Sequence, residues 1–269
     1  MCIIVYKPQG AAFPAKKTLQ RCFERNSDGA GFMLADGEKV IIKKGYMTFN
    51  GFYKALKKAR ENYGDDAAFV VHFRISTQAG TRADCTHPFP LSADMRDLRR
   101  LECSCDVGIA HNGVISLTSA GYYKQVTYSD TMKFITDYLS LIIDSKEYYK
   151  DPRKAELIGR LADGSRLAIL DGSGHCELIG AGWVEDGGIW YSNGGYKDFK
   201  PIIKTTGAPS LVGWSDYDDE TDFYDSVEGF YNEDAQVYEF GDTSCPLYRF
   251  GDDTFCDMCA RYGECFGGL

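Results

Sequence analysis

The chain has 269 residues, of which 44% are hydrophobic and 26% are charged, and its formal net charge at pH 7 is −9. This length and apolar content suffice for one large or two modest domains with a buried core. No run of about 18 apolar residues occurs, which excludes a membrane-spanning helix, and the acidic balance argues against a nucleic-acid-binding protein. The N-terminal residues lack the features of a signal peptide, so we expect a cytoplasmic protein whose ten cysteines are reduced thiols, metal ligands or a nucleophile.

Strand and helix patterns alternate along the first 205 residues, which predicts a mixed domain of both element types. The pair Asp36-Gly37 lies between two short apolar runs and predicts a two-residue hairpin turn. Asp171-Gly172 marks a second hairpin. In chain order we expect strands at 3–5, 32–35, 40–43, 67–73, 107–110, 166–170, 177–179 and 189–192, and helices at 52–63 and 130–143.

The charge is unevenly distributed along the chain. Residues 1–213 have a net charge of +4, whereas residues 214–269 have 2 basic and 15 acidic residues. Composition therefore changes abruptly near 209–213, and we expect a folded domain at 2–205, an acidic segment at 206–242 and a Cys-rich segment at 243–269. Between 214 and 242 there are eleven acidic residues and eight aromatics. This stretch is interpreted either as a solvated linker or as a segment that docks on a basic surface of its own domain or of a partner.

Cys2 is the first candidate for chemistry, because a small residue after the initiator Met1 permits removal of that methionine. Removal would leave Cys2 with a free α-amine, whose pKa of about 7.7–8.0 suits it to take the thiol proton near neutral pH. Taken alone, a cysteine at this position is more often a buried residue that opens a strand.

Four short motifs follow Cys2, and each has a plain structural interpretation. Arg74 can be a surface ion-pair partner, Asn112-Gly113 a hairpin turn, and Asp130 a helix N-cap. Ser129 or Thr131 could supply that cap instead. As an ordered set behind Cys2, however, the motifs predict catalytic and substrate-binding residues. They are His72-x-Arg74-x-x-Thr77, His87-Pro88-Phe89, Ala110-His111-Asn112-Gly113 and Asp130-Thr131.

Together with Cys2 and the segment Arg25-Asn-Ser-Asp28-Gly29-Ala-Gly31, this set resembles the class II glutamine amidotransferases, a branch of the N-terminal-nucleophile hydrolases. The spacing is similar to that of their compact, stand-alone members, and the resemblance covers about residues 2–200. It implies an α+β fold built as a four-layer αββα sandwich, followed here by a small acidic, Cys-rich C-terminal segment. Ile75 and Gln78 stand where sugar-phosphate amidotransferases have aromatic or His residues, which argues against a hexosamine-type synthase.

The resemblance implies a role for each matching residue. Cys2 would be the nucleophile with its own α-amine as general base, and the Asn112 side-chain amide and the Gly113 N–H would form the oxyanion hole. A planar guanidinium suits a carboxylate, so an arginine would bind the α-carboxylate of glutamine. An aspartate would bind its α-ammonium group. The implied substrate-binding residues are Arg74 for the α-carboxylate, Asp130 for the α-ammonium group, and Thr77 and His87 for the pocket wall.

The function that the resemblance implies is hydrolysis of glutamine through a γ-glutamyl thioester, without a catalytic cofactor. The ammonia would pass to a synthase or ligase on a separate chain, because no nucleotide-binding motif or acceptor domain accompanies the matching region. Two alternatives remain open at this point. One is an amidase of the same fold that acts on γ-glutamyl peptides or another amide, and the other is a catalytically inactive interaction scaffold.

Four cysteines within 21 residues near the end of the chain form the pattern C-x10-C-x2-C-x5-C. A tetrahedral Zn²⁺ site with four thiolates would hold together a segment too small for a hydrophobic core. An iron–sulfur cluster and thiols without a metal are the alternatives. The candidate ligands are Cys245, Cys256, Cys259 and Cys265.

Overall fold

The computed structural model describes residues 2–76, 81–123, 126–198, 229–232 and 237–240. Two units make up the chain, at residues 1–200 and 201–269.

The first unit contains two large antiparallel sheets. The strands of the seven-stranded sheet are, in spatial order, β12 (Val184–Asp186), β13 (Ile189–Tyr191), β1 (Ile3–Lys7), β4 (Phe69–Phe73), β2 (Ala30–Ala35), β3 (Val40–Tyr46) and β6 (Glu102–Cys105). Those of the four-stranded sheet are β11 (Cys176–Ile179), β10 (Arg166–Asp171), β7 (Val107–Asn112) and β5 (Phe89–Pro90). A separate short pair consists of β8 (Gly121–Tyr123) and β9 (Val126–Tyr128). Every strand expected from the sequence is present.

The central strands β1, β4 and β2 of the seven-stranded sheet are buried on both faces, which explains why they have nearly continuous apolar runs. Successive residues of a strand point to opposite faces, so in β1 Ile3 and Val5 join one hydrophobic cluster, whereas Ile4 and Tyr6 join another. The second cluster also holds residues of β7 and β10. The two sheets therefore face each other across a shared core.

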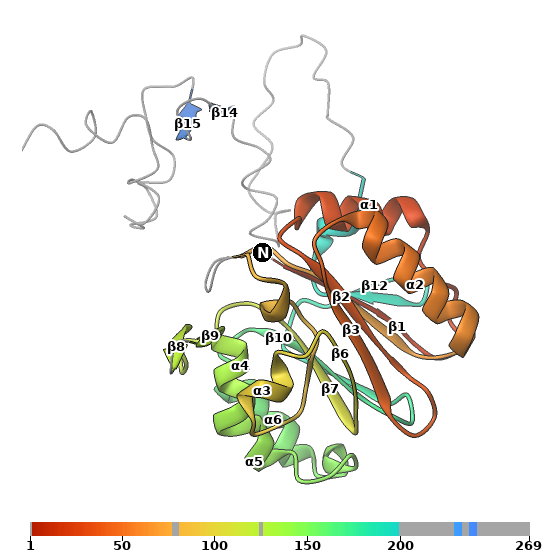
Figure 1. The fold of residues 1–269 in the computed structure, drawn as a ribbon, viewed down its shortest axis with the longest axis vertical. Helices are drawn as coiled ribbons and strands as arrows, with labels where there is room; N and C mark the ends of the chain where they lie inside the picture. Colours follow the sequence, from red (N-terminus) through yellow and green to blue (C-terminus); the bar gives the residue numbers. More distant parts are fainter. Residues whose placement is uncertain (1, 77–80, 124–125, 199–228, 233–236, 241–269) are drawn as a thin grey trace, which may run out of the picture. The chain divides into compact units, whose positions relative to one another are not determined.

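Helices cover the outer faces of the two sheets (Figure 1). They are α1 (Lys16–Arg25), α2 (Phe49–Tyr63), α3 (Met95–Leu98), α4 (Asp130–Phe134), α5 (Ser140–Ile142) and α6 (Pro152–Leu161), with a π-helical turn, η2 (Ile135–Leu139), between α4 and α5. Short 3₁₀ turns are η1 (Ala83–Cys85), η3 (Tyr148–Lys150) and η4 (Gly194–Tyr196). α1 and α2 share a cluster with the seven-stranded sheet, and the other helices share one with the four-stranded sheet. The first unit is thus an α+β fold.

Both helices expected from the sequence are present, at α2 and in the succession of α4, η2 and α5. α1 and α6 were not expected from the sequence. Each has 10 residues, whereas α2 has 15, and helical periodicity is read over a window of about 11–18 residues.

The expected two-residue turn between β2 and β3 is wrong. The loop that connects these strands spans residues 36–39. Its conformation follows from Asp36, whose Oδ1 accepts hydrogen bonds from the backbone N–H groups of Glu38 (3.0 Å) and Lys39 (2.7 Å). The Asp36 carboxylate thus finds its hydrogen-bond donors within the loop. This arrangement favours a longer loop than a tight hairpin with Asp-Gly at its centre would have.

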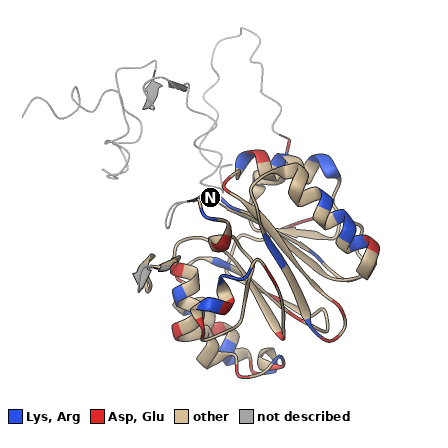
Figure 2. Ribbon diagram, viewed as in Figure 1, with Lys and Arg blue, Asp and Glu red and all other residues tan. Residues whose placement is uncertain are grey.

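Positive charge gathers on the two helices that cover the seven-stranded sheet (Figure 2). Together α1 and α2 have eight Lys or Arg residues and two Glu residues. These helices turn their apolar stripes to the core and their charged residues outward. One of the two interpretations of the acidic segment, docking, requires such a basic surface, and both interpretations stay predictions.

In the second unit, β14 (Gly229–Asn232) and β15 (Val237–Phe240) pair as antiparallel strands. The four candidate zinc ligands, Cys245, Cys256, Cys259 and Cys265, lie outside the described residues. The expected segments at 206–242 and 243–269 therefore stay predictions. Among the helices of the described ranges, none is both long and apolar enough to cross a membrane.

Candidate active site

The strand register places Cys2 beside Arg74. In the antiparallel pair of β1 and β4, Ile3 is opposite Phe73, so the residue before β1 meets the residue after β4. The Cys2 Sγ lies 3.4 Å from both the backbone oxygen and the backbone nitrogen of Ile75. A candidate nucleophile and a candidate recognition cation, distant in sequence, thus lie together at one end of the sheet.

The segment around Asp28 holds the end of β4 in place. Arg74 donates its backbone N–H to Gly29 O (2.8 Å), and Asp28 donates its own to Arg74 O (2.9 Å). The Asp28 carboxylate also accepts the Ser76 N–H (2.7 Å). This part of the sequence motif therefore has a structural role, which is to support the segment that carries Arg74.

The end of β7 brings His111, Asn112 and Gly113 to the site from the other sheet. Asn112 is buried, its Nδ2 donates to Ser192 Oγ (3.0 Å), and its Oδ1 has no hydrogen-bond partner among the described residues. Gly113 has a φ of +144°, and a Cβ there would lie 2.3 Å from Ser165 Oγ. Both the backbone conformation and the close contact require glycine at this position.

The N-terminus of α4 supplies the carboxylate. Its N-cap is Ser129, whose Oγ accepts the Met132 N–H (3.2 Å), so the simple capping interpretation of Asp130 is wrong. The Asp130 carboxylate instead accepts the N–H of Ile115 at Oδ2 (3.0 Å) and that of Thr131 at Oδ1 (2.7 Å). A carboxylate oxygen accepts about two hydrogen bonds, so Oδ2 keeps capacity for a further donor.

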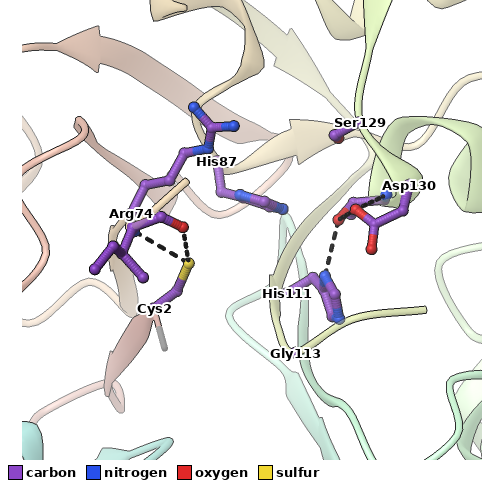
Figure 3. A pocket seen from close by; sticks show the side chains of 9 residues that line it. Cys2, Arg74, His87, His111, Gly113, Ser129 and Asp130 are labelled. Carbon is purple, nitrogen blue, oxygen red and sulfur yellow. Dashed lines mark hydrogen bonds between the residues drawn. The ribbon is translucent and has the colours of Figure 1, made fainter. Parts of the chain in front are cut away.

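These segments surround a small pocket, in which Cys2 and Arg74 lie on one side and Asp130 on the other, with the His87 ring between them (Figure 3). The lining residues are Cys2, Arg74, Ile75, His87, His111, Gly113, Ser129, Asp130 and Thr131. The pocket thus combines a thiol with one positive and one negative side chain.

Burial raises the pKa of the Cys2 thiol above its usual range, and the hydrogen bond from Ile75 and the nearby charge of Arg74 offset this only in part. The thiol is therefore protonated at neutral pH. Because the thiolate is the reactive form, Cys2 needs a neighbouring base to act as a nucleophile.

Three buried histidines lie side by side, and two of them, His87 and His111, line the pocket. The ring centroids of His72 and His87 are 4.3 Å apart, and those of His87 and His111 are 6.1 Å apart. Burial lowers the pKa of His72 to about 3, that of His111 to about 4, and that of His87 well below its usual range. His111 Nδ1 lies 2.8 Å from Thr131 Oγ1, whereas neither ring nitrogen of His87 has a hydrogen-bond partner in the part of the chain that the structure describes. All three rings are neutral at pH 7, so the part of the pocket wall that His87 and His111 form is polar but uncharged.

No protein-family model matches the sequence, and no curated protein matches it. Among solved structures, the chain is similar to the glutamine phosphoribosylpyrophosphate (PRPP) amidotransferase from B. subtilis complexed with ADP and GMP. The sequence identity is 15% and the TM-score is 0.43, over 71% of this chain and 41% of that chain. The chain thus spans less than half of that protein. These values do not establish a family, so the function rests on the geometry of the site itself.

Most of the site residues predicted from the sequence come together. Those that line the pocket are Cys2, Arg74, His87, Gly113 and Asp130. Asn112 precedes Gly113 but does not line the pocket, and its amide contacts Ser192 instead. Thr77 lies outside the described residues.

Four other lining residues, Ile75, His111, Ser129 and Thr131, were not among the catalytic and binding residues predicted from the sequence, although His111 and Thr131 stand in its motifs and Ser129 and Thr131 were candidate caps. Each is the immediate neighbour of a predicted site residue, and that adjacency was the available signal. Within the described ranges, His, Cys, Asp and Glu side chains form no group of three or more that could hold a metal ion.

Proposed function

We propose that this protein is a glutamine-hydrolysing amidotransferase with an N-terminal cysteine nucleophile. The observation that carries the proposal is one pocket lined by the Cys2 thiol, the Arg74 guanidinium and the Asp130 carboxylate. Glutamine offers a neutral amide to cleave and an α-carbon with one carboxylate and one ammonium group. A nucleophile with one cation and one anion matches those three requirements.

The charges support recognition of a free α-amino acid. The planar guanidinium of Arg74 can bind the α-carboxylate through two parallel hydrogen bonds. Asp130 Oδ2 accepts one hydrogen bond from the fold and has capacity for the α-ammonium group. The neutral histidines add polar groups without adding charge, so they would not compete with Arg74 and Asp130 for the two charged groups on the α-carbon of the substrate.

The raised pKa of the buried thiol supports a mechanism with a base. After removal of Met1, the α-amine of Cys2 would take the thiol proton, since its own pKa is about 7.7–8.0. The thiolate would attack the amide carbon of glutamine. The protonated α-amine of Cys2 would then return the proton to the leaving nitrogen as the C–N bond breaks. Ammonia would leave, and water would then hydrolyse the γ-glutamyl thioester and restore the thiol.

The negative charge on the amide oxygen would be stabilised by the Gly113 N–H and the Asn112 side-chain amide. Gly113 lines the pocket at a positive φ, and Asn112 is held by a hydrogen bond directly before it. Donors that are fixed before the reaction cost no reorganisation when charge develops, which is the reason that such sites contribute strongly to rate.

We further infer that the two sheets and their outer helices form the four-layer αββα sandwich of the N-terminal-nucleophile hydrolases. In this proposal the catalytic domain ends near residue 205, and a synthase or ligase on another chain consumes the ammonia. The cytoplasmic location stays a prediction.

The proposal is tested by mass spectrometry of the purified chain and by measurement of ammonia released from glutamine. We expect loss of Met1, release of ammonia, and labelling of Cys2 alone by a diazo-ketone analogue of glutamine. Cys2→Ala should abolish hydrolysis, and Cys2→Ser should keep at most a small residual activity. The partly buried Cys103, on β6, provides a matched control, since Cys103→Ala should leave both labelling and activity unchanged. Full activity in Cys2→Ala would contradict the mechanism.

A panel of γ-glutamyl peptides and other amides, assayed beside glutamine, separates the alternatives. Faster release from a γ-glutamyl peptide would identify an amidase of the same mechanism. No turnover of any amide, with Met1 removed and Cys2 unlabelled, would favour an inactive scaffold and overturn the proposal.

A further inference from the structure

Ser192 connects the two sheets at the proposed active site. Its fully buried Oγ accepts the backbone N–H of Ile4 (2.8 Å) and the side-chain Nδ2 of Asn112 (3.0 Å). Its own backbone N–H donates to Ile4 O (2.9 Å). Ile4 lies on β1, the strand that begins directly after Cys2, and Asn112 is the last residue of β7 in the other sheet. One hydroxyl oxygen therefore joins the strand of the nucleophile to the strand of the proposed oxyanion donors.

Asn193, the next residue, holds the nucleophile residue directly. Its Nδ2 donates to the backbone oxygen of Cys2 (2.8 Å), and its Oδ1 accepts the Gly195 N–H (2.9 Å), so both ends of its amide are fixed. The paired register of β1 and β13 begins at Val5. Ser192 and Asn193 thus extend the contact, through side chains, to the residue that bears the thiol.

The hydrogen-bonding capacity of the Ser192 hydroxyl makes this contact specific. A hydroxyl oxygen has two acceptor positions, and here the Ile4 N–H and Asn112 Nδ2 occupy both. Because Asn112 Nδ2 has two hydrogens, a bond to Ser192 through one of them sets the plane of the amide and the direction of the other. Loss of the hydroxyl would release the amide plane and the Ile4 N–H together.

We infer that Ser192 and Asn193 are positioning residues, which keep the Cys2 nucleophile aligned with the Asn112 and Gly113 oxyanion site. The inference rests on the proposed function. Neither residue lines the pocket, so each acts through the groups that it holds. The first residues of a chain fray unless they are tied down, and a misplacement of about 1 Å at a reacting group can cost about 100-fold in rate.

Kinetics of Ser192→Ala test the inference. We expect kcat for glutamine hydrolysis to fall about 10- to 100-fold, because the nucleophile and the oxyanion donors lose their common support. KM for glutamine should change less than about threefold, since Arg74 and Asp130 keep their contacts. Ser140→Ala is the matched control, because it removes a hydroxyl that donates to Thr136 O (2.9 Å) within the helical segment around η2. The control should leave both constants unchanged.

Hydrogen exchange read by mass spectrometry tests the contact without any substrate. In Ser192→Ala the Ile4 N–H loses its acceptor, so the peptide covering residues 2–7 should exchange faster, while α6 should exchange as in the wild type. If Ser192→Ala does not fold, Asn193→Ala takes its place, because it leaves the Ser192 hydroxyl and its contacts intact, with the same expected kcat loss and faster exchange of the same peptide. Wild-type kcat, a KM increase as large as the kcat loss, or unchanged exchange in this peptide would overturn the inference.

Failure of the proposed function would look different. In that case the wild type itself would release no ammonia from glutamine, and exchange of the peptide at residues 2–7 would alone decide whether Ser192 and Asn193 hold the start of the chain. An active wild type with an equally active, normally exchanging Ser192→Ala variant would leave the proposed function intact and remove only the positioning role.

Discussion

In the proposed function Asp130 has two tasks, because the carboxylate that would bind the substrate also accepts the N–H groups of Ile115 and Thr131. Its replacement would therefore disturb the start of α4 as well as substrate recognition. A variant at Asp130 could not separate the two effects. Arg74 and Asn112 are better probes at the scale of single residues, since one is assigned to binding and the other to the transition state.

We expect Arg74→Lys to raise KM for glutamine more than it lowers kcat, because lysine cannot form the bidentate contact with the α-carboxylate in the ground state. Asn112→Ala should instead lower kcat about 100- to 1,000-fold with a smaller change in KM, as expected for loss of an oxyanion donor. Steady-state kinetics with glutamine measure both constants. The same kinetic pattern in the two variants would show that the division into binding and transition-state roles is wrong.

At the scale of elements, β3 shows how the strand period separates two lysines. Lys44 is buried, and its Nζ donates to the backbone oxygens of Leu98 (2.6 Å) and Asp84 (3.2 Å). Burial lowers its pKa well below the usual range. Its neighbour Lys43 faces the other side of the sheet and forms a partly exposed ion pair with Glu102 (3.0 Å). Adjacent residues of one type therefore have very different energetic roles.

Lys44→Met should lower the free energy of unfolding by about 2–4 kcal/mol, because two carbonyl groups at a buried site lose their donor. Lys43→Met is the control and should cost no more than about 1 kcal/mol, the usual value of an exposed ion pair. Urea unfolding followed by circular dichroism measures both. Equal losses in the two variants would mean that the buried contacts of Lys44 do not stabilise the connection of β3 with η1 and α3.

At the scale of the whole molecule, the three neutral histidines make stability depend on pH. In the unfolded chain a histidine has a pKa of about 6.5, whereas burial lowers that of His111 to about 4 and that of His72 to about 3. Below about pH 6.5 the unfolded chain therefore binds protons that the folded chain does not. The sign follows from linkage, since the state that binds more protons gains on acidification.

We expect the free energy of unfolding to fall as the pH decreases from about 6.5 to about 4, by up to about 1.4 kcal/mol per pH unit for each of these histidines. Urea midpoints at pH 7, 6 and 5 measure the slope. His72→Gln should make the slope shallower, and His175→Gln, which removes a partly exposed histidine outside the cluster, is the control. An unchanged slope in His72→Gln would contradict the burial cause.

The C-terminal cysteines lead to a prediction about the metal content of the full-length protein. We expect one Zn²⁺ per chain, bound by Cys245, Cys256, Cys259 and Cys265, when the protein is purified under reducing conditions without chelator. Elemental analysis decides this, and a metal-free full-length protein would contradict it. A chain that ends at Gly213 should lack the metal and keep most of its glutamine hydrolysis. Loss of hydrolysis in that chain, if it is well folded, would show that residues 214–269 complete the active site.

Short-range patterns predicted a large part of this protein. Apolar runs, helical periodicity and the ordered motifs behind Cys2 depend on neighbours within a few residues, so every expected strand and both expected helices are present. The helix α1 was missed because it is short and buries only two residues. The length of the loop at Asp36 was predicted wrongly because a side-chain hydrogen bond sets its conformation. In the same way, the lining residues Ile75 and Thr131 were signalled only by their adjacency to predicted ones.

What only the tertiary structure decided is which distant residues meet. The contact between Ile4 and Ser192 joins positions that are 188 residues apart, and no local pattern marks either one. The register of β1 and β4 places Cys2 beside Arg74. Both faces of these two strands are buried, so a slip of one residue would turn the side chains of a strand into the opposite hydrophobic cluster. The neutrality of the histidines has the same origin, since only packing between the layers removes these rings from water.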